Sequence, residues 1–203
     1  METMAVKLTF TEGILGTCPN DEDIYKRFIV DKGRSNGADI PEDVEVKELE
    51  ALPVDEQMDK GMTVFPRTED GKPFLYDYQI KGFFKDTCAM LKRVPGTKSS
   101  KVKAYKKEID GLIFPSERQI VFENAEMDIC QRPLRAQTMQ GERVALAMSE
   151  EIKAGATVTF SIRYLLPEHG DLIREWLDYG ELRGIGQWRN SGKGRFLWEE
   201  ITA

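Results

Sequence analysis

The chain has 203 residues, of which 40% are hydrophobic and 32% are charged, and its formal net charge is −6. This composition is typical of a soluble globular protein, and the length suits a single domain with a sizeable core. No apolar run is long enough to span a bilayer and no secretory signal pattern opens the chain, so we expect a cytoplasmic protein without a membrane partner.

The few cysteines and histidines limit the chemistry that the chain can perform. Cys18, Cys88 and Cys130 are widely spaced without a Cys-x-x-Cys pair, and His169 is the single histidine. A disulfide framework, a zinc site or a catalytic triad is therefore disfavoured, and we expect no metal and no cofactor. His169 lies in a turn-like Pro-Glu-His-Gly stretch, which makes it a poor candidate for a general base.

The first third of the chain alternates between strand and helix signals. Residues 5–10 alternate apolar and polar side chains, and the glycine-bounded residues 13–17 follow, which predicts a strand and a tight loop. Residues 21–30 begin with carboxylates and carry apolar side chains at helical spacing, which predicts a short helix. An Asp-Gly step between residues 61–67 and residues 73–76 predicts a β-hairpin.

The remaining elements continue this α+β pattern. Ile80, Phe84, Cys88 and Leu91 fall on one face of a predicted amphipathic helix over residues 78–91. A further helix is expected to begin after Gly170 and to end at Gly180. The strand candidates are residues 111–115, 118–122, 143–148, 155–165 and 196–201. We expect two packed layers, an antiparallel sheet covered by helices.

Charge is unevenly distributed along the chain. Residues 38–60 contain nine acidic side chains and two lysines, whereas residues 81–107 contain nine basic side chains and one aspartate. Such a division can place a positive surface beside a negative one, or the lysines can simply solvate a loop.

A glycine-rich segment near the C-terminus is the most specific feature of the sequence. Between residues 183 and 195, glycines alternate with Arg183, Arg189, Lys193 and Arg195 around Trp188. Glycine lets the backbone approach phosphates, the cations supply charge, and the indole offers a stacking face for an unpaired base. The segment follows a predicted helix and precedes a strand, so it is neither a Rossmann loop nor a Walker loop. The alternative is a flexible connection.

Four segments of the sequence resemble the RAMP superfamily of CRISPR effector-complex proteins, particularly its guide-RNA-binding backbone subunits. Residues 8–17 are similar to the opening strand and its glycine, and residues 75–85 to the strand-to-helix step, in which Lys81-Gly82 match. Residues 150–160 resemble the strand that follows a glutamate, and residues 185–196 the terminal glycine-rich loop. Ala154 and Ile185 depart from the pattern, where the superfamily has proline and glycine.

The resemblance implies a single domain over residues 1–203 with a ferredoxin-like, RRM-like fold. It implies a basic thumb-like loop, for which residues 92–107 are the candidate, and from the charge pattern we expect residues 38–60 to form an acidic insertion in this domain. It also implies single-stranded RNA or DNA as a partner, with further copies of the chain or other RAMP-like subunits beside it. The expected nucleic-acid-binding residues are Lys81, Lys85, Lys92, Arg93, Lys101, Lys103, Arg183, Gly184, Gly186, Trp188, Arg189, Gly192, Lys193, Gly194 and Arg195.

Two other functions remain open at this level. The acidic stretch and the negative net charge also suit a phage-encoded interaction protein that docks on a host nucleoprotein complex. Asp21 and Asp23 lie near the position of a cleaving aspartate in nuclease members of the superfamily, although carboxylates at a helix start explain them equally well. The pattern favours a binding protein without catalytic residues over a metal-dependent ribonuclease.

Overall fold

The computed structural model describes residues 1–20, 62–138 and 141–201, with the backbone alone for residues 134–138 and 141–145. The helix expected at residues 21–30, the acidic insertion at residues 38–60 and the two aspartates Asp21 and Asp23 lie outside the described residues. No helix among the residues that the structure describes is long and apolar enough to cross a membrane.

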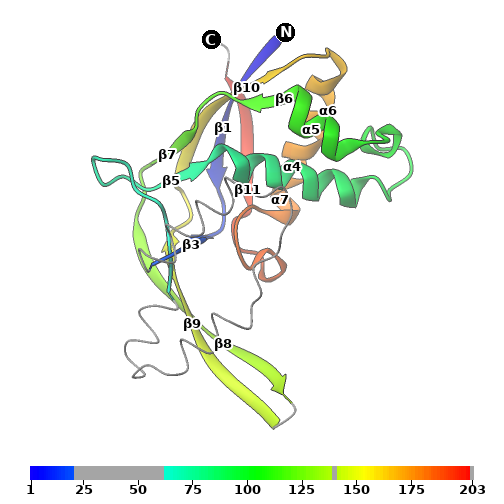
Figure 1. The fold of residues 1–203 in the computed structure, drawn as a ribbon. Coiled ribbons are helices and arrows are strands. Elements are labelled where there is room, and N and C mark those ends of the chain that lie inside the picture. Colours follow the sequence, from blue (N-terminus) through cyan, green and yellow to red (C-terminus); the bar gives the residue numbers. More distant parts are fainter. Residues whose placement is uncertain (21–61, 139–140, 202–203) are drawn as a thin grey trace.

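A six-stranded sheet with the order β11-β1-β10-β7-β5 forms the centre of the molecule, and β6 also pairs with β10 (Figure 1). All of these strand pairs are antiparallel. The strands are β1 (Glu2–Phe10), β5 (Phe74–Tyr76), β6 (Ile113–Pro115), β7 (Gln119–Glu123), β10 (Thr157–Tyr164) and β11 (Phe196–Ile201).

One face of this sheet is apolar because the side chains of each strand alternate between its two faces. Met4, Val6, Leu8 and Phe10 of β1 are all buried. They lie beside β10 in a register that pairs Val6 with Phe160, whose side chain is also buried. The alternation predicted for residues 5–10 and 155–165 is therefore confirmed, and it specifies the register, since a shift of one residue would expose the core side chains.

Helices cover the apolar face of the sheet (Figure 1). Helix α4 buries Ile80, Phe84 and Cys88, as the sequence predicts, and the ring of Phe84 lies 5.3 Å from that of Trp176 in α6. The helices are α4 (Asp77–Leu91), α5 (Tyr105–Leu112), α6 (Glu168–Asp178) and the short α7 (Gly180–Arg183), with 3-10 turns η1 (Ser99–Lys101) and η2 (Arg189–Ser191). The expected mixed α+β class with an antiparallel sheet is confirmed.

A second sheet of five strands contains a long hairpin. Strands β8 and β9 pair without interruption from Met127 and Ile152 to Thr138 and Gly141, and the hairpin projects from the body of the molecule (Figure 1). The strands are β2 (Ile14–Leu15), β3 (Cys18–Pro19), β4 (Thr63–Val64), β8 (Met127–Thr138) and β9 (Gly141–Ile152). The sequence predicted part of β9 but not β8, which contains Pro133. Proline is tolerated there because β8 pairs with β9 alone among the described strands.

Three local expectations need correction. Helix α6 begins at Glu168, before Gly170, because Pro167 has a φ of −54° that suits a first helical turn. Gly180 does not end the helical segment but begins α7, which stops at Gly184 with a φ of 72°. The turn after residue 67 is present, with Gly71 N donating to Thr68 O at 2.8 Å. An antiparallel bridge joins Arg67 to Pro73, so the predicted hairpin is present next to its turn. Its two strands then diverge: β4 pairs with β3 and β9, whereas β5 pairs with β7.

Candidate nucleic-acid interface

The glycine loop, residues 184–195, is closed by two of its own glycines. Gly184 and Gly194 both have a φ of 72°, a region that glycine adopts readily. A Cβ on Gly194 would lie 1.9 Å from the carbonyl oxygen of Ile185, and Ile185 N donates to Gly194 O at 2.9 Å. The two ends of the loop therefore lie backbone to backbone, and a side chain at Gly194 has no space.

The loop is also fixed to the turn after β1. Gly194 N donates to Gly13 O at 2.9 Å, and Thr11 N donates to Arg195 O at the same distance. Lys193 Nζ lies 2.5 Å from Glu151 Oε1 at the end of β9. These contacts hold the C-terminal half of the loop against both sheets.

Asp86 on helix α4 joins the loop to the helical layer. Its Oδ2 accepts hydrogen bonds from Arg183 Nε at 2.8 Å and from Arg189 Nη1 at 2.6 Å. All three side chains are about one quarter exposed. Burial raises the pKa of the Asp86 carboxyl, but the hydrogen bonds and charges of the two arginines outweigh burial and hold the pKa below its ordinary value. One carboxylate binds two guanidinium groups, so the net charge of Asp86, Arg183 and Arg189 together is +1.

Two neighbouring pockets lie along helix α4 and the loop, and Gly186 and Arg189 line both of them. The first part, of about 380 Å³, lies between the start of α4 and Ile185, and the second part, of about 520 Å³, follows the loop to Ser191. We call the two parts together the glycine-loop groove. The lining residues are Thr17, Tyr78, Gln79, Gly82, Phe83, Arg183, Ile185, Gly186, Gln187, Trp188, Arg189, Asn190 and Ser191.

Polar contacts fix the shape of the first part of the groove. Gln79 Oε1 accepts from Tyr76 N at 2.7 Å, and Gln79 Nε2 donates to Thr17 Oγ1 at 2.9 Å. Tyr78 stacks on Tyr76 with ring centroids 5.1 Å apart, and the guanidinium of Arg118 lies 5.7 Å from the Tyr78 ring. An aromatic side chain, Tyr78, thus lines the first part of the groove, and Trp188 lines the second part.

Trp188 contacts an arginine that the sequence did not point to. The guanidinium of Arg132 on β8 lies 4.0 Å from the centroid of the Trp188 ring. Arg132 is 6% exposed, and burial lowers its pKa below the ordinary value. Its Nη2 donates to Ser149 Oγ at 3.1 Å, but Nε and Nη1 have no hydrogen-bond partner in the described part of the chain. A prediction of strand β8 would have pointed to Arg132. Pro133 lies within that strand, however, and a proline argues against a strand in the sequence.

The structure gathers the predicted residues of the loop and separates them from the predicted lysines of α4. Lys85 Nζ lies 2.6 Å from Asp110 Oδ1, and Lys81 Nζ donates to the backbone carbonyl of Asp110 at 3.2 Å. Both lysines therefore face α5, whereas Asp86 faces the loop. The loop residues that lie together are Arg183, Gly184, Gly186, Trp188, Arg189, Gly192, Lys193, Gly194 and Arg195.

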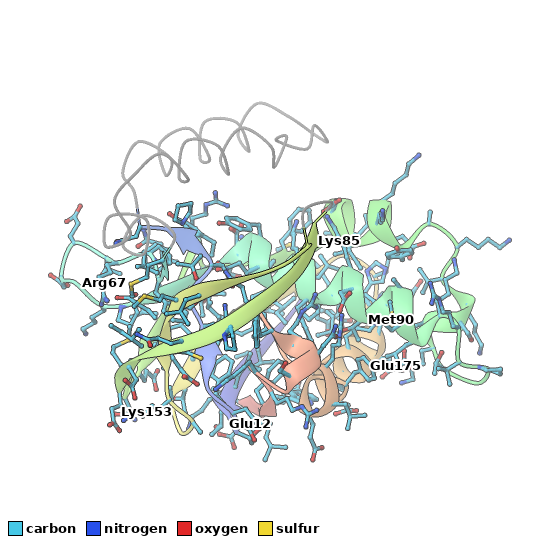
Figure 2. All side chains as sticks on the ribbon, turned by 90° about the horizontal axis from the view of Figure 1, so that it is seen from below. Glu12, Arg67, Lys85, Met90, Lys153 and Glu175 are labelled. Carbon is cyan, nitrogen blue, oxygen red and sulfur yellow. The ribbon has the colours of Figure 1, made fainter. Side chains whose placement is uncertain are left out.

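The basic residues after α4 lie beyond the C-terminal end of that helix, away from the glycine loop (Figure 1). Lys92 Nζ donates to Lys103 O at 3.1 Å, and Lys101 and Lys103 line a separate pocket of about 640 Å³ beside the start of α6. Arg93 is exposed next to them. Figure 2 shows Met90 and Glu175 together at this helical side of the molecule, far from Arg67 and Lys153. Residues 92–107 contain η1 and the beginning of α5.

The four segments of the sequence resemblance meet at the glycine loop and the groove beside it. The first contributes Gly13 and Thr17, and the second contributes Gln79. The third contributes Glu151, and the fourth is the glycine loop itself. Gly16 is required as well, because a Cβ there would lie 2.4 Å from the backbone carbon of Val64. The described residues contain no group of three or more histidine, cysteine, aspartate or glutamate side chains that could hold a metal ion.

Neither a known protein family nor a curated protein matches the sequence. Among solved structures, the chain is similar to one chain in a cryo-EM structure of the Type III-B Cmr-beta bound to cognate target RNA. The TM-score is 0.49, the sequence identity is 13%, and the alignment covers 99% of this chain and 60% of the other. The protein thus spans about three fifths of the length of that chain.

Proposed function

We propose that this protein binds single-stranded nucleic acid, RNA in particular, along the glycine-loop groove and does not cleave it. The observation that carries the proposal is the position of Trp188 in a pocket whose Gly186 and Arg189 also line the pocket at the start of α4. Stacking on aromatic side chains and cationic contacts to phosphates are the two interactions on which single-strand binding depends.

The groove contains side chains for both interactions. Arg183 and Arg189 line it and exceed the charge of Asp86 by one, so the cluster attracts phosphates while the carboxylate holds both guanidinium groups in place. The aromatic side chains of Tyr78 and Trp188 line its two parts. Rings accept any base, so we expect little sequence preference. Asp86 is occupied by two arginines, which makes it unsuited to general base catalysis.

We further propose that the central sheet is a ferredoxin-like core of the RAMP type. Strand β1, helix α4, strands β7 and β10, helix α6 and strand β11 follow one another along the chain in the order βαββαβ. Their sheet order, β11-β1-β10-β7, and the meeting of the four resembling segments at the glycine loop and the groove beside it support this assignment. Assembly of several copies along one strand is part of the proposal, and sizing chromatography with and without a long oligonucleotide tests it.

Fluorescence anisotropy with labelled oligonucleotides tests the binding itself. We expect saturable binding to single-stranded RNA at low salt, with affinity that falls steeply as salt increases, and weaker binding to duplex RNA. Arg189→Ala should weaken binding roughly tenfold, about the effect of losing one charge-assisted contact. Arg163→Ala is the matched control, because Arg163 is exposed on the face of the sheet away from the helices. Absence of binding to RNA and to single-stranded DNA at low salt would refute the proposal.

A further inference from the structure

Arg132 is a buried cation whose hydrogen-bonding capacity is mostly unused. Nη2 donates to Ser149 Oγ and the Cys130 side chain also interacts with the guanidinium, while Nε and Nη1 are buried without a hydrogen-bond partner among the described residues. Glu151, the carboxylate whose charge acts on Arg132, is itself bound by Lys193 at 2.5 Å. Buried donors without acceptors are costly, so the contact between Arg132 and Trp188 is not the arrangement that stabilises the guanidinium best.

Trp188 is also held unfavourably. Its φ of 55° places a bulky residue in the left-handed region, where non-glycine side chains are rarely found. The guanidinium of Arg132, 4.0 Å from the ring centroid, covers the indole face. An unfavourable backbone and an undersatisfied cation thus occur at a single contact, which is typical of a contact that is exchanged during function.

The surroundings allow this exchange. Gly186 and Gly192 flank Trp188 in the chain, and both have positive φ values, 88° and 87°. Arg132 comes from β8, which pairs with β9 alone among the described strands. The contact therefore joins two elements that can separate without breaking the central sheet.

We propose that Arg132 and Trp188 together form a subsite for one nucleotide of the bound strand, and that each covers the other until the strand arrives. The base stacks on the indole face that the guanidinium now occupies, and the phosphate of the same nucleotide accepts two parallel hydrogen bonds, one from the unpaired Nη1 of Arg132 and one from the second hydrogen of Nη2. An arginine offers two parallel donors that match a phosphate, and an indole stacks on any base. This subsite rests on the proposed binding function and extends it to a residue of the β8–β9 hairpin.

Arg132→Met separates this role from a structural one. Methionine keeps the length and apolar stem of the side chain but removes the charge and the unpaired donors. We expect affinity for single-stranded RNA to fall roughly tenfold and the salt dependence to lose about one phosphate contact. We expect the thermal midpoint of the free protein to stay the same or rise, because replacing an undersatisfied buried cation by an apolar side chain is often neutral or stabilising. Arg163→Met is the matched control and should change neither property.

Fluorine NMR of the protein labelled with 5-fluorotryptophan tests the stacking directly. The chain has three tryptophans, and the Trp188 signal is identified by its loss in Trp188→Phe. Trp176 is buried in the core and serves as the internal reference. We expect an oligouridylate to shift the Trp188 signal and an abasic oligonucleotide of equal length to shift it much less, while the Trp176 signal stays in place.

The outcomes distinguish the two proposals. If the wild-type protein binds RNA and Arg189→Ala weakens that binding, but Arg132→Met binds as well as the wild type, the subsite is wrong and the groove stands. A lower thermal midpoint in Arg132→Met with unchanged affinity assigns Arg132 a structural role and also overturns the subsite. If the wild-type protein does not bind single-stranded RNA or DNA, the groove proposal is wrong, and the subsite, which depends on it, is wrong as well.

Discussion

Asp86 on helix α4 accepts a hydrogen bond of 2.6 Å from Arg189, which lies 103 residues further along the chain. This contact places the most specific sequence feature, the glycine loop, beside the helix that lines the opposite wall of the groove. The position of Arg189 at the junction of the two parts of the groove depends on it.

Asp86→Asn should destabilise the protein in a pH-dependent way. Because the arginines hold the folded-state pKa of Asp86 below its ordinary value of 3.8, its charge contributes stability above that pH and the contribution disappears as the pH falls through the lower folded-state pKa. We expect the substitution to lower the free energy of unfolding by about 2 kcal/mol at pH 7, because hydrogen bonds between charged groups are weakened or lost. Urea unfolding of the wild type and of Asp86→Asn at pH 7 and pH 3 measures this loss. If the difference in free energy of unfolding between the two proteins is as large at pH 3 as at pH 7, the stabilising role of the Asp86 charge is wrong.

Gly194→Ala should be among the most damaging single-methyl additions in the chain. The new Cβ would meet the carbonyl oxygen of Ile185 at 1.9 Å, so the closed loop must open or shift. We expect a loss of more than about 2 kcal/mol in free energy of unfolding. Gly111→Ala is the control: nothing lies within 4 Å of its Cβ, and alanine suits the helix, so it should be neutral or stabilising by up to about 1 kcal/mol. Equal effects of the two changes would disprove this account.

Ser99→Ala should destabilise the helical layer. Ser99 is fully buried, and its Oγ accepts from Trp176 Nε1 at 2.9 Å while donating to Glu175 Oε2 at 2.5 Å. Alanine leaves the buried indole N–H without an acceptor, which costs about 1–3 kcal/mol. Chemical denaturation measures the loss. Ser100→Ala removes only a local turn contact to Thr97 and should cost less than 1 kcal/mol, about the net value of one ordinary hydrogen bond.

The lysines of α4 should matter less for binding than Arg189. Lys81 and Lys85 are engaged by Asp110 on the side of the helix that faces α5. We expect Lys81→Ala and Lys85→Ala each to change RNA affinity less than about threefold, because each lies outside the groove and contributes only long-range charge. Titration by fluorescence anisotropy beside Arg189→Ala provides the comparison, and a tenfold loss in either lysine variant would place the strand on the α5 side instead.

Thiol reactivity should follow burial. Burial raises the pKa of the Cys88 thiol, and both Cys18 and Cys88 are buried, whereas Cys130 is partly exposed. Since the thiolate is the reactive form, we expect Ellman's reagent to modify Cys130 alone in the native protein and all three cysteines after denaturation. Rapid native-state modification of Cys88 would show that the core around α4 opens readily.

Local patterns were sufficient for the elements that form the core. The alternation around Val6 and Phe160 and the helical spacing of Ile80, Phe84 and Cys88 each lie within one element, where a single period decides which face is buried. Strand β8 escaped prediction because Pro133 lies within it, and that proline is acceptable because β8 pairs with β9 alone among the described strands. The early start of α6 escaped prediction because Pro167 reads as a turn residue until its φ is known.

By itself, the sequence determined that the protein has an α+β fold and a loop in which glycines alternate with cations and an indole, because these properties depend on residues that are neighbours in the chain. Only the tertiary structure decided that Asp86 binds Arg183 and Arg189, that Lys81 and Lys85 face away from the loop, and that Arg132 covers Trp188. These contacts join elements far apart in sequence, and their geometry depends on sheet order and helix rotation, which local periodicity does not encode.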